Sequence, residues 1–305
     1  MKAKNTAQFQ TIGFLGRANM KEDAPFLKQL KAYFDKKKNI TVMWDNNLSE
    51  VLGKKNEKPR PTILKHAHLV LSLGGDGTLL KLVRDLPLRK NLYVLGVNLG
   101  TLGFNTEVFE TKKVFPLLDE ILAGQYHTDD RLLLRATLYR KGVKIATHLA
   151  LNEAVINQGN FARLIGLYCE IDQRKMIEFK ADGIIVATPT GSTGHSLSAG
   201  GPIIHPRIDG FVFTPICPSE LTVRPIVIPS NRQLTVRVDT ERRYADNQIG
   251  LTIDGQIMVP VEYGDIVKIR ASHRKLRLIR AAIKSSGGGN YYKLLREKLS
   301  WGKKA

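Results

Sequence analysis

The sequence contains only two cysteines and lacks any apolar run long enough to span a bilayer. Cys169 and Cys217 are far apart in a chain of 305 residues and have no metal-type spacing, which predicts reduced core thiols without disulfides. A membrane-spanning helix needs roughly 20 apolar residues, and residues 1–6 lack the apolar stretch of a signal peptide. We therefore expect a cytoplasmic protein that has no membrane partner.

Acidic residues are scarce relative to basic ones. The chain has 28 Asp and Glu against 47 Lys and Arg, a formal net charge of +19. Such an excess attracts nucleic acid, an acidic membrane surface or polyanionic nucleotides. The basic residues are spread along the chain, and no helix-turn-helix, zinc-finger or aromatic RNA-binding signature accompanies them. Nucleic acid is therefore not expected as a partner.

The first part of the chain alternates apolar runs with helical patterns and contains no internal repeat. The alternating segments are residues 11–15, 24–34, 40–44, 69–73, 79–86, 92–98 and 114–122. Alternating strands and helices predict an α/β, doubly wound parallel sheet, whose ligand lies at the carboxyl ends of the strands. Because the chain exceeds the usual size of a single core, we expect two domains.

Strand patterns dominate after Gly124. Apolar and polar residues alternate over 134–138 and 234–238, and Asp254-Gly255 separates two short apolar runs as in a hairpin. The prediction is an α/β N-terminal doubly wound domain plus a mainly β C-terminal domain. The predicted boundaries are 1–124 for the α/β domain, completed by a C-terminal helix at 290–305, and 125–289 for an all-β domain.

Three glycines surround one carboxylate directly after the apolar run 69–73. Residues 74–78 read Gly-Gly-Asp-Gly-Thr, and glycine lets backbone N–H groups approach an anion closely, most of all where a helix begins. Asp76 would repel phosphate, so we expect it to handle a sugar hydroxyl or a metal ion beside the phosphates. An ordinary Asp-Gly turn would explain the dipeptide alone.

A second stretch, residues 182–202, favours the same chemistry. It runs from Asp182 through an apolar strand into a loop rich in Ser, Thr and Gly. Hydroxyls and backbone amides at this density suit ribose and phosphate. Apolar residues flank the loop on both sides, which favours a functional loop held against a core over a solvated linker.

Together these stretches resemble the NAD kinase family, in particular the bacterial-type ATP-NAD kinases. The shared motifs are GGDG at 74–77, Asn-Glu at 152–153, TPTGST at 188–193, SLSAGGP at 196–202, and the segments 98–104, 214–218, 224–226 and 254–256. Lipid kinases and phosphofructokinases are similar at GGDG alone. All the motifs in this order are highly specific and cover most of the chain.

The resemblance implies transfer of the γ-phosphoryl group of ATP to the 2′-hydroxyl of the adenosine ribose of NAD, giving NADP and ADP. It implies an NAD kinase-like fold with a C-terminal NAD-binding domain, Mg²⁺ or another divalent cation as cofactor, and a homo-oligomer, either dimer or tetramer. NAD and ATP would be its partners.

The resemblance also assigns roles to residues. Asp76 would be catalytic, and Gly74, Gly75, Gly77 and Thr78 would form the phosphate-binding turn. The expected NAD-binding residues are Asp76, Gly77, Lys81, Asn152, Glu153, Arg163, Lys180, Asp182, Thr193, Gly194, His195, Ser196, Leu197, Ser198 and Gln256.

The pair Asn152-Glu153 also makes physical sense as a nucleotide site. It interrupts an apolar stretch, and a buried polar pair destabilises the fold unless it finds partners. Asn can bond a base edge, and Glu can accept hydrogen bonds from ribose hydroxyls. Alternatively, neighbouring backbone groups would satisfy the hydrogen bonds of this pair, whose role would then be purely structural. Lys81 would add charge beside Asp76 from the first turn of a helix, or be a plain surface residue.

Two positions depart from the family pattern. Gly194-His195 stands where the family usually has Ala-Tyr, and Ser219-Glu220 stands where it tends to have a histidine. A histidine ring still stacks on a base, although it is smaller and titratable. These changes affect the expected affinity for substrate more than the expected activity.

Two other functions compete with this one. A lipid kinase of the diacylglycerol or sphingosine type shares the glycine turn but needs an apolar acyl cleft and leaves the TPTGST loop unexplained. A non-enzymatic, basic nucleotide-binding protein fits the charge but not the placement of Asp76.

Overall fold

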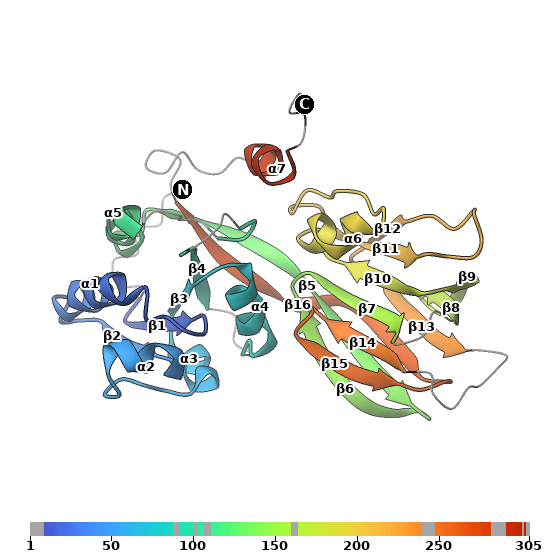
Figure 1. Cartoon of the computed structure of the whole chain (residues 1–305), viewed down its shortest axis with the longest axis horizontal. Coiled ribbons are helices and arrows are strands. Elements are labelled where there is room, and N and C mark those ends of the chain that lie inside the picture. The colour runs from blue at the N-terminus through green and yellow to red at the C-terminus, as the bar shows by residue number, and fades with distance from the viewer. Residues whose placement is uncertain are drawn as a thin grey trace. The chain divides into compact units, whose positions relative to one another are not determined.

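The computed structural model describes residues 9–87, 92–99, 103–106, 111–159, 164–239, 248–281, 291–300 and 302. The chain forms two compact units, residues 1–130 with 276–305 and residues 131–275, and its course is drawn in Figure 1. The divisions fall inside strands β5 (Tyr126–Arg140) and β16 (Ile266–Ala281). The sequence instead places boundaries after 124 and 289, where the pattern changes; these domain limits stay a prediction.

The first unit contains a parallel sheet in the order β2-β1-β3-β4-β16. Its strands are β1 (Thr11–Gly16), β2 (Thr41–Trp44), β3 (Leu69–Leu73), β4 (Tyr93–Val97) and the end of β16. All five residues of β3 are buried, as expected for a central strand covered on both faces. The doubly wound α/β prediction is confirmed for this unit.

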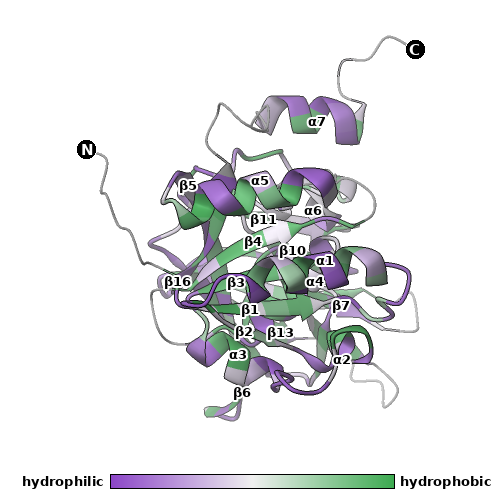
Figure 2. Cartoon of the chain, turned by 90° about the vertical axis from the view of Figure 1, so that its left-hand side faces the viewer, coloured by the Kyte–Doolittle hydropathy of each residue, from purple (hydrophilic) through white to green (hydrophobic). Residues whose placement is uncertain are grey.

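Helices connect these strands and bury one apolar side each. They are α1 (Ala24–Asp35), α2 (Asn46–Leu52), α3 (Arg60–His66), α4 (Asp76–Arg84), α5 (Thr111–Leu122) and α7 (Tyr291–Leu299). In α1 the buried residues are Phe26, Leu27, Leu30 and Phe34, and Figure 2 shows polar and apolar colours alternating along α1 and α5. The sequence analysis missed α2 and α3, because helices of seven residues are too short for a clear helical period.

The second unit contains antiparallel strands in two groups. One sheet has the order β12-β11-β10-β7-β14-β15, and the other group pairs β16 with β13 and β5, β13 with β8, β8 with β9, and β5 with β6. The strands are β6 (Val143–Ala150), β7 (Glu153–Gln158), β8 (Ile165–Ile171), β9 (Arg174–Ala181), β10 (Gly183–Ala187), β11 (Gly210–Ile216), β12 (Ile226–Pro229), β13 (Gln233–Asp239), β14 (Ile249–Ile253) and β15 (Ile257–Val261).

One hydrophobic core joins the two groups of strands. Leu134 and Leu138 of β5 belong to the same buried cluster as Ile184 of β10 and Phe213 of β11. The two sheets therefore pack face to face, as in β-sandwiches. The loop after β10 folds into short helical turns, η1 (Gly191–Thr193) and α6 (His195–Ser198), so the unit is mainly β rather than all-β.

The structure corrects one cysteine prediction. Both cysteines are free and Cys169 is buried, but Cys217 is exposed, because it follows the last residue of β11 and leaves the sheet with φ of 44°. No helix within the described part of the chain is long and apolar enough to cross a membrane.

Candidate active site and nucleotide-binding bend

The glycine turn connects β3 to α4 in the first unit. Gly74 adopts φ of +144°, a conformation that favours glycine, and its N–H donates to the Val97 carbonyl of the neighbouring strand at 2.9 Å. No side chain caps the start of α4, and a Cβ added at Gly75 or Gly77 would meet no atom within 4 Å. The space beside these two glycines is open, and the first amides of a helix without a side-chain cap suit a phosphate.

The carboxylate of Asp76 is held at the first residue of α4 by backbone groups. Oδ2 accepts the N–H of Phe104 at 2.9 Å, and Oδ1 accepts the N–H of Asn105 at 3.2 Å. A Cβ at Gly103 would lie 2.5 Å from Oδ1, so only glycine lets this backbone approach. Asp76 is half-buried, and each carboxylate oxygen keeps a lone pair for a hydroxyl or a cation. Sequence reasoning gave no role to Gly103 or Asn105.

Lys81 lies elsewhere on the helix than the sequence predicts. The prediction starts the helix at residue 79 and places Lys81 in its first turn, but α4 starts at Asp76 and Lys81 belongs to its last turn. Residues five apart do not share a helix face. Lys81 is exposed, and its place as an NAD contact stays a prediction.

In the second unit a bend between β6 and β7 carries Asn152 and Glu153. The carboxylate of Asp254 accepts three backbone N–H groups of this bend, from Leu151 and Asn152 at 2.8 Å and from Glu153 at 2.9 Å. In return, the N–H of Asp254 donates to the Glu153 carbonyl at 3.0 Å. The sequence analysis treated Asp254 as a hairpin turn residue; its place in the family motif was the signal of a further role.

Glu153 carries the most unusual carboxylate of the bend. It is 8% exposed, and its Oε2 has no hydrogen-bond partner among the described residues. Burial, and then the negative charge of Asp254, raise the pKa of Glu153 to about 7. Burial also raises the pKa of Asp254 to about 6, against the three N–H bonds that lower it. An unpaired buried oxygen calls for a partner, which a ligand hydroxyl would supply.

The TPTGST loop packs against the same bend. The N–H of Thr188 donates to the Asn152 carbonyl at 2.8 Å, and its hydroxyl donates to the Leu151 carbonyl. The Gly191 N–H then donates to the Thr188 hydroxyl at 3.1 Å. A Cβ at Gly194 would lie 3.8 Å from Glu153 Oε2, so the loop returns to the unpaired oxygen. The structure therefore brings Asn152, Glu153 and Gly194 together, as nucleotide binding requires.

Two family models match most of the chain. The ATP-NAD kinase N-terminal domain matches residues 12–126, and the ATP-NAD kinase C-terminal domain matches residues 151–281. The NAD kinase of Geotalea daltonii is 44% identical over 245 residues, which are 80% of this chain and 82% of the relative. The chain belongs to the ATP-NAD kinase family. It is an enzyme, a phosphotransferase, as the motifs predict.

Other relatives agree with this assignment. The NAD kinase of Syntrophotalea carbinolica is 38% identical over 88% of this chain and 90% of its own length. Among solved structures, yeast NADH kinase complexed with NADH has a TM-score of 0.81 at 23% identity and covers 98% of this chain and 89% of the relative. An Archaeoglobus fulgidus NAD kinase in complex with ATP has a TM-score of 0.68 at 21% identity and covers 93% of this chain and 98% of the relative. These two likenesses confirm the fold.

The remaining residues predicted to contact NAD differ in their exposure to solvent. Exposed or partly exposed are Thr193, His195, Leu197, Ser198, Lys180, Asp182 and Gln256. Asp182 already accepts a hydrogen bond from Gln158 Nε2 at 2.8 Å. Ser196 is fully buried and its hydroxyl pairs with that of Thr214 at 2.9 Å, which gives it a structural partner. Arg163 lies outside the described residues.

The glycine turn offers a divalent cation one carboxylate ligand, that of Asp76. The described residues contain no cluster of three or more His, Cys, Asp or Glu side chains that would hold a metal. Mg²⁺ is commonly bound by one or two carboxylates together with substrate phosphates and waters. Asp76, beside the glycine turn, fits that mode of binding. It does not fit a site in which protein side chains supply all the ligands.

Proposed function

We propose that this chain transfers the γ-phosphoryl group of ATP to the 2′-hydroxyl of the adenosine ribose of NAD, giving NADP and ADP. Membership of the ATP-NAD kinase family supports the reaction class. The observation that carries the mechanism is the Asp76 carboxylate, fixed by two backbone N–H groups beside an open glycine turn.

In this proposal Asp76 is the catalytic residue. Its carboxylate orients the 2′-hydroxyl and accepts its proton while the hydroxyl oxygen attacks the γ-phosphorus and ADP leaves. The amides of residues 75–77 hold phosphates of ATP, since the N–H groups of Gly74 and Thr78 already donate to the Val97 and Gly75 carbonyls. Asp76, together with those phosphates, would hold Mg²⁺ or another divalent cation, and the cation would supply charge neutralisation. Because phosphoryl transfer also depends on positioning, the two backbone hydrogen bonds that fix this carboxylate support its role as proton acceptor.

The bend of the second unit holds NAD in this proposal. Asn152 binds a base edge, and Glu153 exchanges hydrogen bonds with ribose hydroxyls through its unpaired Oε2. The other contacts proposed are Gly77, Lys81, Arg163, Lys180, Asp182, Thr193, Gly194, His195, Ser196, Leu197, Ser198 and Gln256. The assignment to this family argues against a lipid kinase, which would have no use for the TPTGST loop packed against Asn152.

A choice of acceptor tests the function. Purified protein is incubated with ATP and Mg²⁺ and with either NAD or diacylglycerol vesicles, and NADP, ADP and phosphorylated lipid are measured. We expect NADP and ADP in equal amounts with NAD, and no lipid product. Lipid phosphorylation without NADP would favour the lipid kinase, and no product from either acceptor would favour a non-enzymatic nucleotide-binding protein.

We also propose a homo-oligomer, either dimer or tetramer, and a cytoplasmic location. Leu221, Ile226 and Val227 of the second unit are exposed apolar residues, which favour burial against another protein surface. The two unpaired cysteines favour a reducing compartment. Light scattering on the purified chain tests the oligomer, and a monomeric mass would contradict it. Cell fractionation tests the cytoplasmic location.

A further inference from the structure

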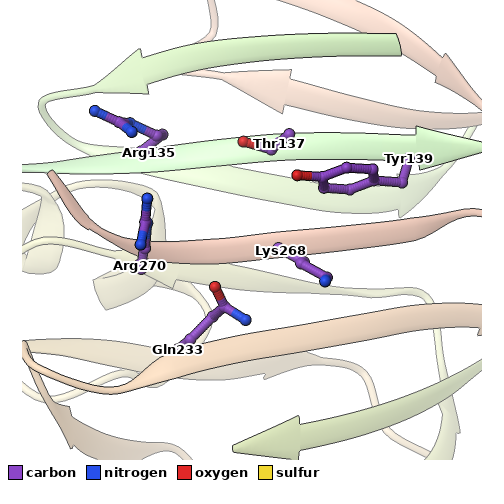
Figure 3. Close-up of a pocket in the computed structure, with 6 residues that line it drawn as sticks. All are labelled: Arg135, Thr137, Tyr139, Gln233, Lys268 and Arg270. Carbon is purple, nitrogen blue, oxygen red and sulfur yellow. The ribbon is translucent and has the colours of Figure 1, made fainter. Parts of the chain in front are cut away.

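A polar pocket lies on the outward face of the β5, β16 and β13 strands, within the second unit. It has a volume of about 160 Å³ and is lined by Arg135, Thr137, Tyr139, Gln233, Lys268 and Arg270 (Figure 3). None of these residues belongs to the bend at Asn152 or to the TPTGST loop. The pocket therefore lies outside the nucleotide site described above.

The strand register explains why these side chains gather. Along β5, Arg135, Thr137 and Tyr139 alternate with the buried Leu134, Ala136 and Leu138, so they share the face turned away from the core. Across the sheet, Gln233 of β13 is the register partner of Arg270 of β16. Figure 3 shows the Arg270 side chain extending toward Arg135.

The three cations of this pocket are not neutralised. Arg135, Lys268 and Arg270 form no salt bridge with any acidic residue in the described part of the chain, and no carboxylate lines the pocket. Arginines close to them in sequence are paired: Arg140 contacts Asp265 at 2.8 Å, and Arg232 contacts Asp172 at 2.9 Å. The pocket therefore holds three positive charges that no carboxylate of its lining balances.

Neutral donors complete the lining. Thr147 donates its hydroxyl proton to Thr137 at 3.2 Å, which leaves the Thr137 proton to be donated elsewhere. The Lys268 ammonium lies 5.2 Å from the centre of the Tyr139 ring, which holds the cation beside the phenol. Burial, and then the positive charge of Arg135, lower the pKa of Arg274, consistent with an uncompensated positive potential on this face.

We propose that this pocket binds a phosphate group or a short phosphate chain. Two guanidinium groups suit the geometry of phosphate oxygens, and the ammonium, hydroxyl and amide groups supply further donors. A water molecule occupies about 30 Å³, so the recess has room for about five, the size range of phosphate and pyrophosphate. The site is independent of the proposed NAD and ATP contacts.

Protection of Lys268 from acylation tests this site without relying on activity. The full chain is treated with an amine acylating reagent without divalent cations, alone or with orthophosphate or pyrophosphate, and modification at each lysine is followed by mass spectrometry. We expect both anions to slow modification of Lys268 and to leave Lys144 of β6, which is exposed, unchanged. Stronger protection by pyrophosphate would identify a phosphate chain as the ligand; equal protection would identify a single phosphate group.

A pair of charge variants separates this pocket from the glycine turn, which also binds phosphates in our proposal. The double variant Arg135→Gln with Arg270→Gln should raise the pyrophosphate concentration for half-protection of Lys268 by about tenfold or more, because charged hydrogen bonds are lost. The matched control, Arg207→Gln with Arg296→Gln, removes the same charge from exposed residues outside the pocket and should change this concentration little. Unprotected Lys268 in the wild-type chain, or equal shifts in the two folded double variants, would overturn the proposal.

Discussion

At the scale of single residues, the two carboxylates at the bend are in opposite situations. The carboxylate oxygens of Asp254 accept hydrogen bonds from three backbone N–H groups, whereas Oε2 of Glu153 has no partner among the described residues. A buried polar atom without a partner lowers stability. The unpaired Oε2 of Glu153 therefore lowers the stability of the fold, and a bound nucleotide would supply the missing hydrogen bond.

The raised pKa of Glu153 makes stability depend on pH. Its folded pKa of about 7 is above the ordinary value of 4.5 for a glutamate, so the folded state binds more protons between these values and stability falls as pH rises through this window. We expect Glu153→Gln to be more stable than wild type at about pH 8, by on the order of 1–3 kcal/mol, and nearly equal at about pH 5. Denaturant unfolding at both pH values measures this. The exposed control Glu178→Gln should show no such pH dependence; a Glu153→Gln difference that is the same at both values would contradict the assignment.

His195 is the residue where the chain departs from the usual family pattern, and it is exposed at the start of α6. Histidine changes charge between about pH 5 and 8, whereas tyrosine does not. If the ring stacks on a base of NAD, His195→Tyr should flatten the pH dependence of NAD affinity across this range and keep or tighten binding. NAD titrations of both proteins measure it. Superimposable affinity profiles would remove His195 from the NAD contacts.

At the scale of elements, both turns are held by groups distant in the sequence. Asp76 depends on residues 104–105, and Asn152-Glu153 depends on Asp254, about 100 residues later. The hairpin of β14 and β15 thus supports the proposed nucleotide site, because it brings Asp254 to the bend. The three backbone N–H groups of residues 151–153 fix that carboxylate in place.

Asp254→Asn tests this positioning role. The amide oxygen replaces one carboxylate oxygen, but the amide NH₂ faces a backbone donor, so at least one of the three hydrogen bonds is lost. We expect a loss of stability of about 1–3 kcal/mol and a KM for NAD that rises far more than the KM for ATP. The control Asp209→Asn, an exposed loop residue, should change neither. Equal changes in both KM values would leave Asp254 with a purely structural role.

These elements also show what the sequence can predict. The apolar runs predicted β3 and α1 closely, and glycine content pointed to the turn at Asp76, because strand periods, helix periods and glycine act locally. The roles of Gly103, Asn105 and Asp254 depend on contacts made across the fold, which no local pattern encodes. For the same reason the basic pocket stayed hidden, since Arg135 and Arg270 come together only through β-sheet pairing.

At the scale of the whole molecule, the net charge of +19 is distributed unevenly. Ion pairs neutralise many arginines, such as Arg140 and Arg277, while the basic pocket keeps its charge. ATP and NAD are anions, so a positive molecule attracts both before they bind. The charge excess therefore fits nucleotide substrates.

Added salt should weaken this attraction. Between about 20 and 200 mM KCl we expect kcat/KM for NAD and for ATP to fall several-fold, while kcat changes little, because the Debye length shortens and long-range attraction is screened. Steady-state kinetics at a series of salt concentrations measures it. A kcat/KM that is constant over this range would show that the net charge plays no part in substrate capture.

The central claim, that Asp76 carries phosphoryl transfer to NAD, is tested most directly by the kinetics of Asp76→Asn. The amide is nearly the same size but cannot accept the hydroxyl proton, so kcat should fall by about 10²- to 10⁴-fold. The KM values for ATP and NAD should change far less than kcat. The unfolding temperature should fall by a few degrees only, because the amide NH₂ faces one of the two backbone N–H groups and one of the two hydrogen bonds is lost. A folded Asp76→Asn protein that forms NADP from NAD and ATP at nearly the wild-type rate would contradict the account.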